Sequence, residues 1–244
     1  SCFLNEANDS LEGIVGLWNE NVWLAARGGG IGSYWGNLRS IGEKVGMNGK
    51  TSGVVPFIRV MSYPNDPANP LPENEWCDEA IRRMKVLARM AEDGGVTLVH
   101  ENCSGWGGQS AENSNILLGE VNSPALKAVF DTGNPVTYGQ DTWEYYKAIE
   151  HDIVYVHIKD AKRIEGEDVY TYCGEGDGYV REVLADLLAK GYAGGVSIEP
   201  HLAAIIHTGE TTDNAQKLYD SYTEYGRRLM GIVAELERQP VGVR

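Results

Sequence analysis

The chain has few cysteines, and they show no pattern. The four cysteines (Cys2, Cys77, Cys103 and Cys173) lie far apart among 244 residues, and no two of them have the CxxC spacing. A chain of this length does not depend on a disulfide framework, so free thiols in a reducing compartment fit the pattern better.

Long apolar runs are also missing. No stretch reaches the ~18 residues that span a bilayer, and the first residues do not show the basic and then apolar pattern of a secretory signal. We therefore expect a cytoplasmic protein with no membrane partner.

Positive charge is scarce. There are 21 lysines and arginines against 35 aspartates and glutamates, which gives a formal net charge of −14. A protein that binds nucleic acid needs a basic surface to displace counterions from the phosphates, so a nucleic-acid partner is not expected. With 42% hydrophobic residues the chain can build one large core, and α/β barrels of this size form single domains. We predict one domain over residues 1–244.

A regular alternation of strands and helices begins at residue 57. The strands are short apolar runs, and amphipathic or capped segments separate them. The predicted strands end at residues 61, 101, 131, 157 and 199, and the predicted helices cover residues 74–93, about ten residues from 111, 141–150, 179–190 and 213–236. Without hairpin signals, this order predicts βαβ units and a parallel sheet covered on both faces.

The fold class that this order favours is an α/β fold of the (β/α)8 TIM-barrel type. Five strands lie beyond residue 57, and at most three precede it. Each βαβ unit needs about 30 residues, so the N-terminal part of the barrel is predicted to be shortened or incomplete. The expected elements there are a strand at 1–4, a helix after Asp9 or Ser10, a strand at 22–26, a glycine-rich loop at 28–32 and a helix at 37–45.

Four residues with metal-binding side chains stand at the ends of four successive predicted strands. They are Glu101, Asp131, His157 and Glu199, spaced by 30, 26 and 42 residues. The carboxyl ends of the strands of a parallel barrel meet on one face, where active sites form. Three carboxylates gathered there repel one another unless a cation lies between them. One imidazole with three carboxylates suits Mn²⁺, Mg²⁺ or Co²⁺. Taken singly, an acidic residue at a strand end is usually a helix cap or a surface charge, and a histidine there is usually a hydrogen-bonding group.

Three motifs resemble one known family. They are HIKDA at 157–161, FDTG at 130–133 and SIEPH at 197–201. Together they resemble the xylose-isomerase-like TIM barrels, a group of sugar-phosphate isomerases, epimerases, inosose dehydratases and endonuclease IV. The resemblance covers about residues 57–236 and little of what precedes them. It implies a barrel with a divalent-metal site, with Mn²⁺ as the predicted ion and Mg²⁺, Co²⁺ or Zn²⁺ as alternatives.

The resemblance also implies roles for individual residues. In the ketose 3-epimerase branch the two matching glutamates transfer protons, which implies Glu101 and Glu199 here. An arginine six residues beyond the metal histidine holds substrate, which implies Arg163. The GEGD turn at 174–177 matches a family loop in which Glu175 would order the rim of the site. This chain has Asn134 where the family often has histidine, and that departure puts a precise epimerase specificity in doubt.

Three further residues are candidates for contacts with substrate. His201 lies two residues beyond Glu199 and therefore faces the same way on a strand; it would contact substrate or support Glu199. Lys159 stands in the same relation to His157 and would bind a substrate oxygen or form a salt bridge with a carboxylate of the barrel. Trp106, in a glycine-rich loop, would stack on a sugar ring or pack within that loop.

The predicted function is that of a divalent-metal-dependent sugar isomerase or epimerase. It would remove a proton next to a metal-bound carbonyl and proceed through an enediolate. A first alternative uses the same site for elimination from a keto-sugar, as a dehydratase or a C-glycoside-deglycosidase-like lyase with a second subunit. A second alternative is a sugar-binding barrel without catalysis. A homo-oligomer, the identity of the sugar and the reacting carbon stay open.

Overall fold

The protein forms two compact units in a computed structural model, residues 1–56 and 57–244. The structure describes residues 57–202, 204–205, 210–211 and 215–238, together with residues 2–6, 8, 10, 13, 16–17, 19–20 and 30–34 of the first unit.

The described part of the first unit contains two parallel strands. Strand β1 (Cys2–Glu6) pairs with β2 (Gly30–Tyr34), in a register that sets Cys2 opposite Gly30. The strand predicted at the N-terminus is present as β1, whereas residues 30–32 of the expected glycine-rich loop begin β2. The strand predicted at 22–26 and the helix predicted at 37–45 lie outside the described residues.

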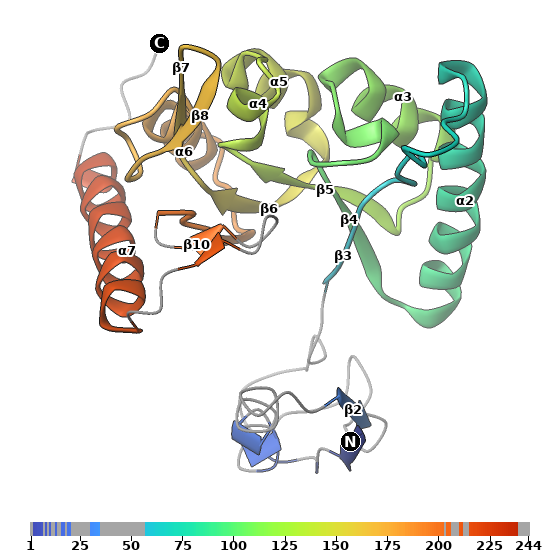
Figure 1. The fold of residues 1–244 in the computed structure, drawn as a ribbon, viewed down its shortest axis with the longest axis horizontal. Helices are drawn as coiled ribbons and strands as arrows, with labels where there is room; N and C mark the ends of the chain where they lie inside the picture. Colours follow the sequence, from blue (N-terminus) through green and yellow to red (C-terminus); the bar gives the residue numbers. More distant parts are fainter. Residues whose placement is uncertain are drawn as a thin grey trace. The chain divides into compact units, whose positions relative to one another are not determined.

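The second unit is built on a parallel five-stranded sheet. Its strands are β3 (Phe57–Val60), β4 (Thr97–Glu101), β5 (Leu126–Asp131), β6 (Ile153–Ile158) and β9 (Gly195–Ile198). Each strand pairs in parallel with the next in the order β3–β4–β5–β6–β9. The sheet curls into a half-barrel (Figure 1). The predicted fold class, a TIM-type barrel with an incomplete N-terminal part, is confirmed for this unit.

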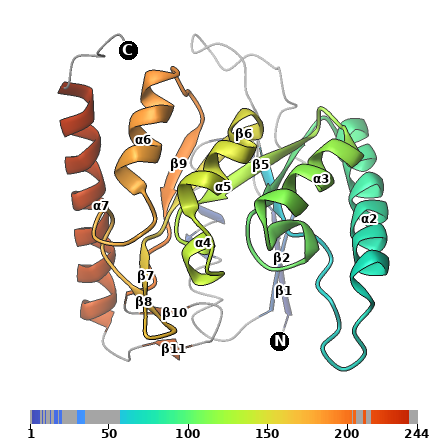
Figure 2. The same cartoon turned by 90° about the horizontal axis from the view of Figure 1, so that it is seen from above.

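Helices cover one side of the sheet. They are α2 (Glu73–Gly94), α3 (Ala111–Val121), α4 (Asn134–Thr137), α5 (Thr142–Ile149), α6 (Val180–Ala189) and α7 (Ala215–Arg238), with short 3-10 turns at Trp106–Gly108 and Glu150–Asp152. From α2 to α7 they follow the curve of the sheet (Figure 2). Among the described residues, no helix is long and apolar enough to cross a membrane.

Capping and packing explain where these helices begin and what they bury. The hydroxyl of Ser110 accepts the N–H of Asn113 at the start of α3, and the carboxylate of Asp141 accepts the N–H of Glu144 at the start of α5. The sheet side chains Phe130 and Ile158 are fully buried among residues of α5, α6 and α7. Burial of each such side chain stabilises the fold by roughly 1.5–3 kcal/mol.

A hairpin lies between the fourth strand of this sheet and the helix predicted at residues 179–190. Strands β7 (Ala161–Ile164) and β8 (Glu167–Tyr170) pair antiparallel. The two turn residues, Glu165 and Gly166, both have positive φ angles, 52° and 90°. Such a turn suits a two-residue hairpin, but glutamate is seldom found in that conformation, so the sequence carries no hairpin signal. A second short antiparallel pair joins β10 (Ala204–Ile205) and β11 (Glu210–Thr211).

Candidate metal centre

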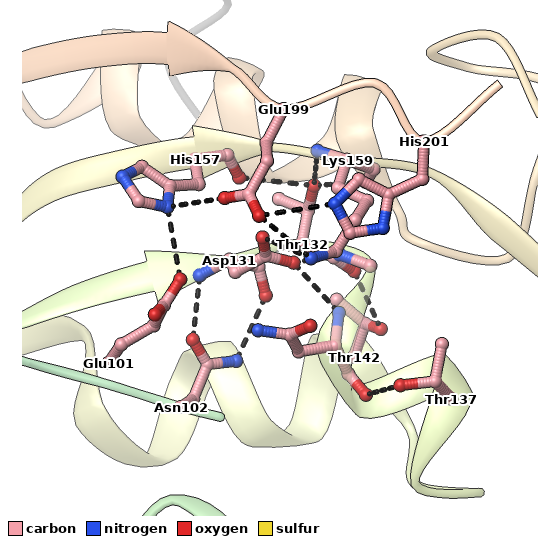
Figure 3. Close-up of polar contacts among 12 residues, drawn as sticks. Glu101, Asn102, Asp131, Thr132, Thr137, Thr142, His157, Lys159, Glu199 and His201 are labelled. Carbon is pink, nitrogen blue, oxygen red and sulfur yellow. Dashed lines mark hydrogen bonds and ion pairs between the residues drawn. The ribbon is translucent and has the colours of Figure 1, made fainter. Parts of the chain in front are cut away.

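The ends of the sheet strands bring the four predicted ligand residues together. Glu101 and Asp131 are the last residues of β4 and β5, His157 is the next-to-last residue of β6, and Glu199 directly follows β9. The register sets Asp131 opposite His157. One potential ligand atom from each of the four lies within 4.8 Å of the others (Figure 3).

His157 lies between two carboxylates. Its Nδ1 atom is 3.1 Å from Oε1 of Glu101 and 3.0 Å from Oε2 of Glu199. Burial would lower the pKa of His157, but the hydrogen bonds to both glutamates outweigh that effect and raise its pKa to about 9. Burial opposes ionisation of the glutamates too, yet the partnership with His157 holds the pKa of each below its usual value. Glu101 and Glu199 are therefore ionised at neutral pH and able to accept a proton.

Asp131 is fully enclosed. Its Oδ1 atom accepts the backbone N–H groups of Gly133 and Asn134, both at 2.8 Å, and Nζ of Lys159 lies 3.0 Å from its Oδ2 atom. Complete burial raises the pKa of Asp131, and the Lys159 ammonium opposes that shift. Burial alone would lower the pKa of Lys159, but Asp131 and Glu199 raise it above its usual value. Lys159 therefore stays charged inside the site.

A second cation reaches the cluster from β3. Nη1 of Arg59 lies 2.6 Å from Oε2 of Glu101, although the arginine side chain is 47% exposed and Glu101 only 1%. Sequence reasoning missed Arg59. It is a single charge in an apolar strand. Its contact with Glu101 depends on the register between β3 and β4, which pairs Arg59 with Val99 and which the sequence does not show.

Polar side chains next to the ligand residues fix the strand ends. Asn102 exchanges two hydrogen bonds with the backbone of Asp131. The hydroxyl of Thr132 donates to the carbonyl of Lys159 at 2.6 Å and accepts its N–H at 3.2 Å. Sequence reasoning missed both residues. Each directly follows a predicted ligand residue, and that position is the signal that could have indicated them.

The donor set fits a divalent cation. Three carboxylates and one imidazole converge, three of the four residues carry formal negative charge, and oxygen-rich sets of this kind favour Mn²⁺, Mg²⁺ or Co²⁺ over softer ions. The chemistry of the cluster supports the same conclusion, because His157 carries a proton between two carboxylates where a cation would otherwise balance their charge. A metal ion and that proton compete for the same groups.

The other predicted residues lie at different distances from this cluster. Nε2 of His201 is 3.3 Å from Oε1 of Glu199, so His201 is next to the cluster. Trp106 is 3% exposed and donates from Nε1 to Glu73 at 2.7 Å, an arrangement that matches packing within the loop and core. Glu175 forms an ion pair with Arg228 of α7.

Arg163 lines a cavity that is separate from the four-residue cluster. Its Nη1 atom donates to the carbonyl of Thr137 at 3.2 Å. It lines a cavity of about 560 Å³ together with Gly174, Gly176 and Asp177, and none of the four cluster residues lines that cavity. The expected substrate contacts of Arg163, Glu175, His201, Lys159 and Trp106 remain predictions.

Comparison with known proteins supports the resemblance seen in the motifs. The model of the xylose isomerase-like TIM barrel family matches residues 52–222. The inosose dehydratases of Lactiplantibacillus plantarum and Geobacillus thermodenitrificans are 23% and 28% identical over 142 residues. That alignment covers 52% of this chain and 47% of each dehydratase, so the chain spans about half their length.

Three solved structures share the fold. A D-tagatose 3-epimerase-like protein has a TM-score of 0.55 at 22% identity, and the alignment covers 73% of this chain and 63% of the epimerase-like chain. The IOLI protein with a bound zinc atom has a TM-score of 0.56 at 13% identity, covering 98% and 77%. D-allulose 3-epimerase from Methylomonas sp., in complex with D-allulose, has a TM-score of 0.50 at 18% identity, covering 68% and 58%.

The N-terminal residues resemble a different barrel. The model of the ribonucleotide reductase barrel domain matches residues 1–64. Ribonucleoside-diphosphate reductase subunit alpha of Chlamydia pneumoniae is 41% identical over 61 residues, which are 25% of this chain and 6% of the reductase subunit. The two family matches overlap over residues 52–64. The assignment of residues 1–244 to a single xylose-isomerase-like domain stays a prediction.

Proposed function

Because the chain belongs to the xylose isomerase-like TIM barrel family, we propose that it is a divalent-metal-dependent isomerase or epimerase of sugars or sugar derivatives. One observation carries the proposal. Two ionised carboxylates, Glu101 and Glu199, both lie next to Nδ1 of His157, at 3.1 and 3.0 Å, with Asp131 completing the set. Two carboxylates at one site can remove a proton and return one.

Glu101, Asp131, His157 and Glu199 would hold the cation, with Mn²⁺ as the ion we propose. When bound, the cation would polarise a substrate carbonyl and acidify the neighbouring C–H group. The fold provides a rigid frame for this chemistry, because each ligand side chain stands at the end of a hydrogen-bonded strand and two of the four are buried.

The proton transfer would fall to the two glutamates. One oxygen of Glu101 is held by Arg59, which leaves Oε1 directed at His157. One oxygen of Glu199 lies near His201 and Lys159, which leaves Oε2 directed at His157. One carboxylate would take the proton from carbon and the other would return one, which inverts the centre or moves the carbonyl. Which glutamate acts first depends on how the sugar lies between them.

Dehydration is the second candidate, and the sequence relatives favour it. Two curated relatives that align with 52% of this chain are inosose dehydratases. The same carboxylate would remove the proton, and a hydroxyl on the next carbon would then leave as water. A lyase acting with a second subunit is a further form of this chemistry.

Mass and isotope analysis distinguish these functions. The chain, loaded with Mn²⁺, would be incubated in D₂O with a panel of ketoses and keto-inositols. Isomerisation or epimerisation conserves mass apart from deuterium at the reacting carbon, whereas dehydration releases water. Glu101→Gln and Glu199→Gln should each lower turnover by about 10²-fold or more, since each removes a proton carrier. Full activity in both variants on every accepted sugar would disprove the proton-transfer role.

A purified chain without bound divalent ion, without turnover and without any change in stability on chelation would instead support a sugar-binding barrel without catalysis. The exposed Glu112 on α3 offers a matched control, because Glu112→Gln removes a carboxylate that is not part of the cluster and should leave turnover unchanged.

A further inference from the structure

Lys159 stands out as a charge inside the site rather than at its rim. Its side chain is 1% exposed, and its Nζ atom lies 3.0 Å from Oδ2 of Asp131 and 3.6 Å from Oε1 of Glu199 (Figure 3). Lysine is almost never buried to this degree unless it is paired. Here it is paired with two of the residues that would hold the cation.

The surrounding chain holds the lysine in place. A Cβ atom at Gly133 would lie 2.6 Å from Cγ of Lys159, so only glycine leaves room for the lysine stem. The hydroxyl of Thr132 binds both the carbonyl and the N–H of Lys159. The ammonium is therefore a built part of the centre, directed at carboxylates.

Burial determines how strongly the Lys159 ammonium interacts with the carboxylates of the site. The three carboxylates Glu101, Asp131 and Glu199 carry a formal charge of −3 when ionised. Arg59 also touches one of them, but it is half exposed, and solvent screens such pairs strongly. The ammonium of Lys159 lies in a low-dielectric interior, where screening is weak. Together Lys159 and the three carboxylates have a net charge of −2, which one divalent cation neutralises.

We propose that Lys159 is a fixed counter-cation that sets the charge selectivity of the metal centre, so that divalent ions are favoured over trivalent ones. This inference rests on the proposed function, in that it takes the four-residue cluster to be a metal site. It gives Lys159 a positioning and specificity role toward the ion, in place of direct contact with substrate. Removing the charge should strengthen binding of every cation, and most of all that of trivalent ions.

The test measures cation affinity directly, without turnover. Dissociation constants for Mn²⁺ and Tb³⁺ would be determined by calorimetry and by terbium luminescence for the wild type, Lys159→Met and Lys159→Gln. Gln keeps a hydrogen-bond donor near Asp131 but has no charge. Because Coulomb energy scales with the charge of the ion, a gain of about tenfold for Mn²⁺ would correspond to a gain of roughly thirtyfold for Tb³⁺.

A matched control removes a lysine–aspartate pair that involves another strand of the sheet. Nζ of Lys127 on β5 lies 2.9 Å from Oδ1 of Asp152, away from the cluster. Lys127→Met should leave both dissociation constants unchanged. Circular dichroism would establish folding of each variant. A Lys159 variant that folds only with added cation can still be tested by titrating its folding with Mn²⁺. Folding at Mn²⁺ concentrations below the wild-type dissociation constant supports the inference. Failure to fold at saturating Mn²⁺ overturns it.

The remaining outcomes separate this inference from the proposed function. If the wild type binds neither ion, the metal centre itself is wrong. If the wild type binds Mn²⁺ and both Lys159 variants bind it equally well or more weakly, the metal centre stands and the counter-cation role is wrong. A gain for Mn²⁺ that equals or exceeds the gain for Tb³⁺ would also overturn the charge argument.

Discussion

Asn102 and Asp131 form a closed ring of two hydrogen bonds between neighbouring strand ends. Nδ2 of Asn102 donates to the carbonyl of Asp131 at 2.9 Å, and the N–H of Asp131 donates to Oδ1 of Asn102 at 2.7 Å (Figure 3). Asn102 directly follows Glu101, so the ring ties the end of β4, with one predicted ligand, to the end of β5, with another. Both partners are buried, where an unpaired polar group is costly.

Asn102→Ala should therefore weaken both the fold and cation binding. Loss of the ring leaves the N–H and the carbonyl of Asp131 without this partner, and we expect the free energy of unfolding to fall by about 1–3 kcal/mol. Urea denaturation and Mn²⁺ calorimetry would measure the two effects. Asn65 provides a control, because it forms the same ring with the backbone of Leu71. Asn65→Ala should lower stability but leave Mn²⁺ affinity intact; equal affinities in both variants would contradict the positioning role.

The sequence allowed the sheet and the strand-end residues to be predicted, because both follow from local patterns. Apolar runs mark the strands, and Glu101, Asp131, His157 and Glu199 all stand within one residue of a strand end. The parallel order then places their ends together. The contacts that could not be predicted depend on the register between strands and on the direction in which side chains point.

Arg59, Asn102 and the β7–β8 hairpin show this limit. The ion pair of Arg59 with Glu101 depends on the register in which β3 pairs with β4. The turn of the hairpin contains a glutamate with a positive φ angle, a conformation that glutamate rarely adopts. For Trp106 the sequence left two interpretations open, stacking on a sugar ring or packing within the loop, and the indole lies among the buried residues of the core. The N-terminal 56 residues lack family motifs, and the ribonucleotide reductase barrel-domain model matches residues 1–64.

Divalent cations should stabilise the fold through His157. An ion at about 100 times its dissociation constant adds about 2.7 kcal/mol to the free energy of unfolding, which corresponds to roughly 5–10 °C in melting temperature at this chain length. We expect Mn²⁺ to raise the melting temperature and a chelator to reverse the rise. His157→Gln should abolish most of this response, whereas His151→Gln, a substitution of an exposed histidine, should retain it. The same response in both variants would argue against His157 as a ligand.

His100 should make stability depend on pH. Nε2 of His100 accepts the backbone N–H of Ser62 at 3.2 Å, and burial lowers the pKa of His100 to about 4. The folded protein thus favours the neutral ring. Its stabilising effect is complete above the unfolded pKa near 6.5 and is lost as the pH falls from there toward 4.

The change is measurable by urea denaturation at several pH values. Between pH 6.5 and 5 this single group should lower the free energy of unfolding by about 1.5 kcal/mol. His100→Gln removes the titrating ring, so its stability should decline less steeply over this interval, even if its absolute stability is lower. His151→Gln should keep the wild-type slope. Identical slopes in the wild type and His100→Gln would rule out a contribution from His100.

The carboxylate of Asp160 organises the loop that follows the hairpin. It accepts the backbone N–H groups of Gly174, Gly176 and Gly178 at 2.8, 3.0 and 2.9 Å, and that of Ala161 at 3.0 Å. A Cβ atom at Gly176 would lie 2.1 Å from Oδ1 of Asp160, so the close approach requires glycine. Gly174 and Gly176 line the cavity beside Arg163, so the wall of that cavity depends on Asp160.

Asp160→Asn should loosen this loop, because one of its two oxygens becomes an amide that cannot accept N–H groups. Hydrogen exchange of the amides at 174, 176 and 178 should accelerate by at least about tenfold, the factor that corresponds to a loss of about 1.4 kcal/mol. Asp152→Asn, which removes an ion pair with Lys127, should leave these amides unaffected. Unchanged exchange in Asp160→Asn would show that the loop holds its conformation without the carboxylate. Faster exchange throughout the protein would indicate general destabilisation instead of a local role.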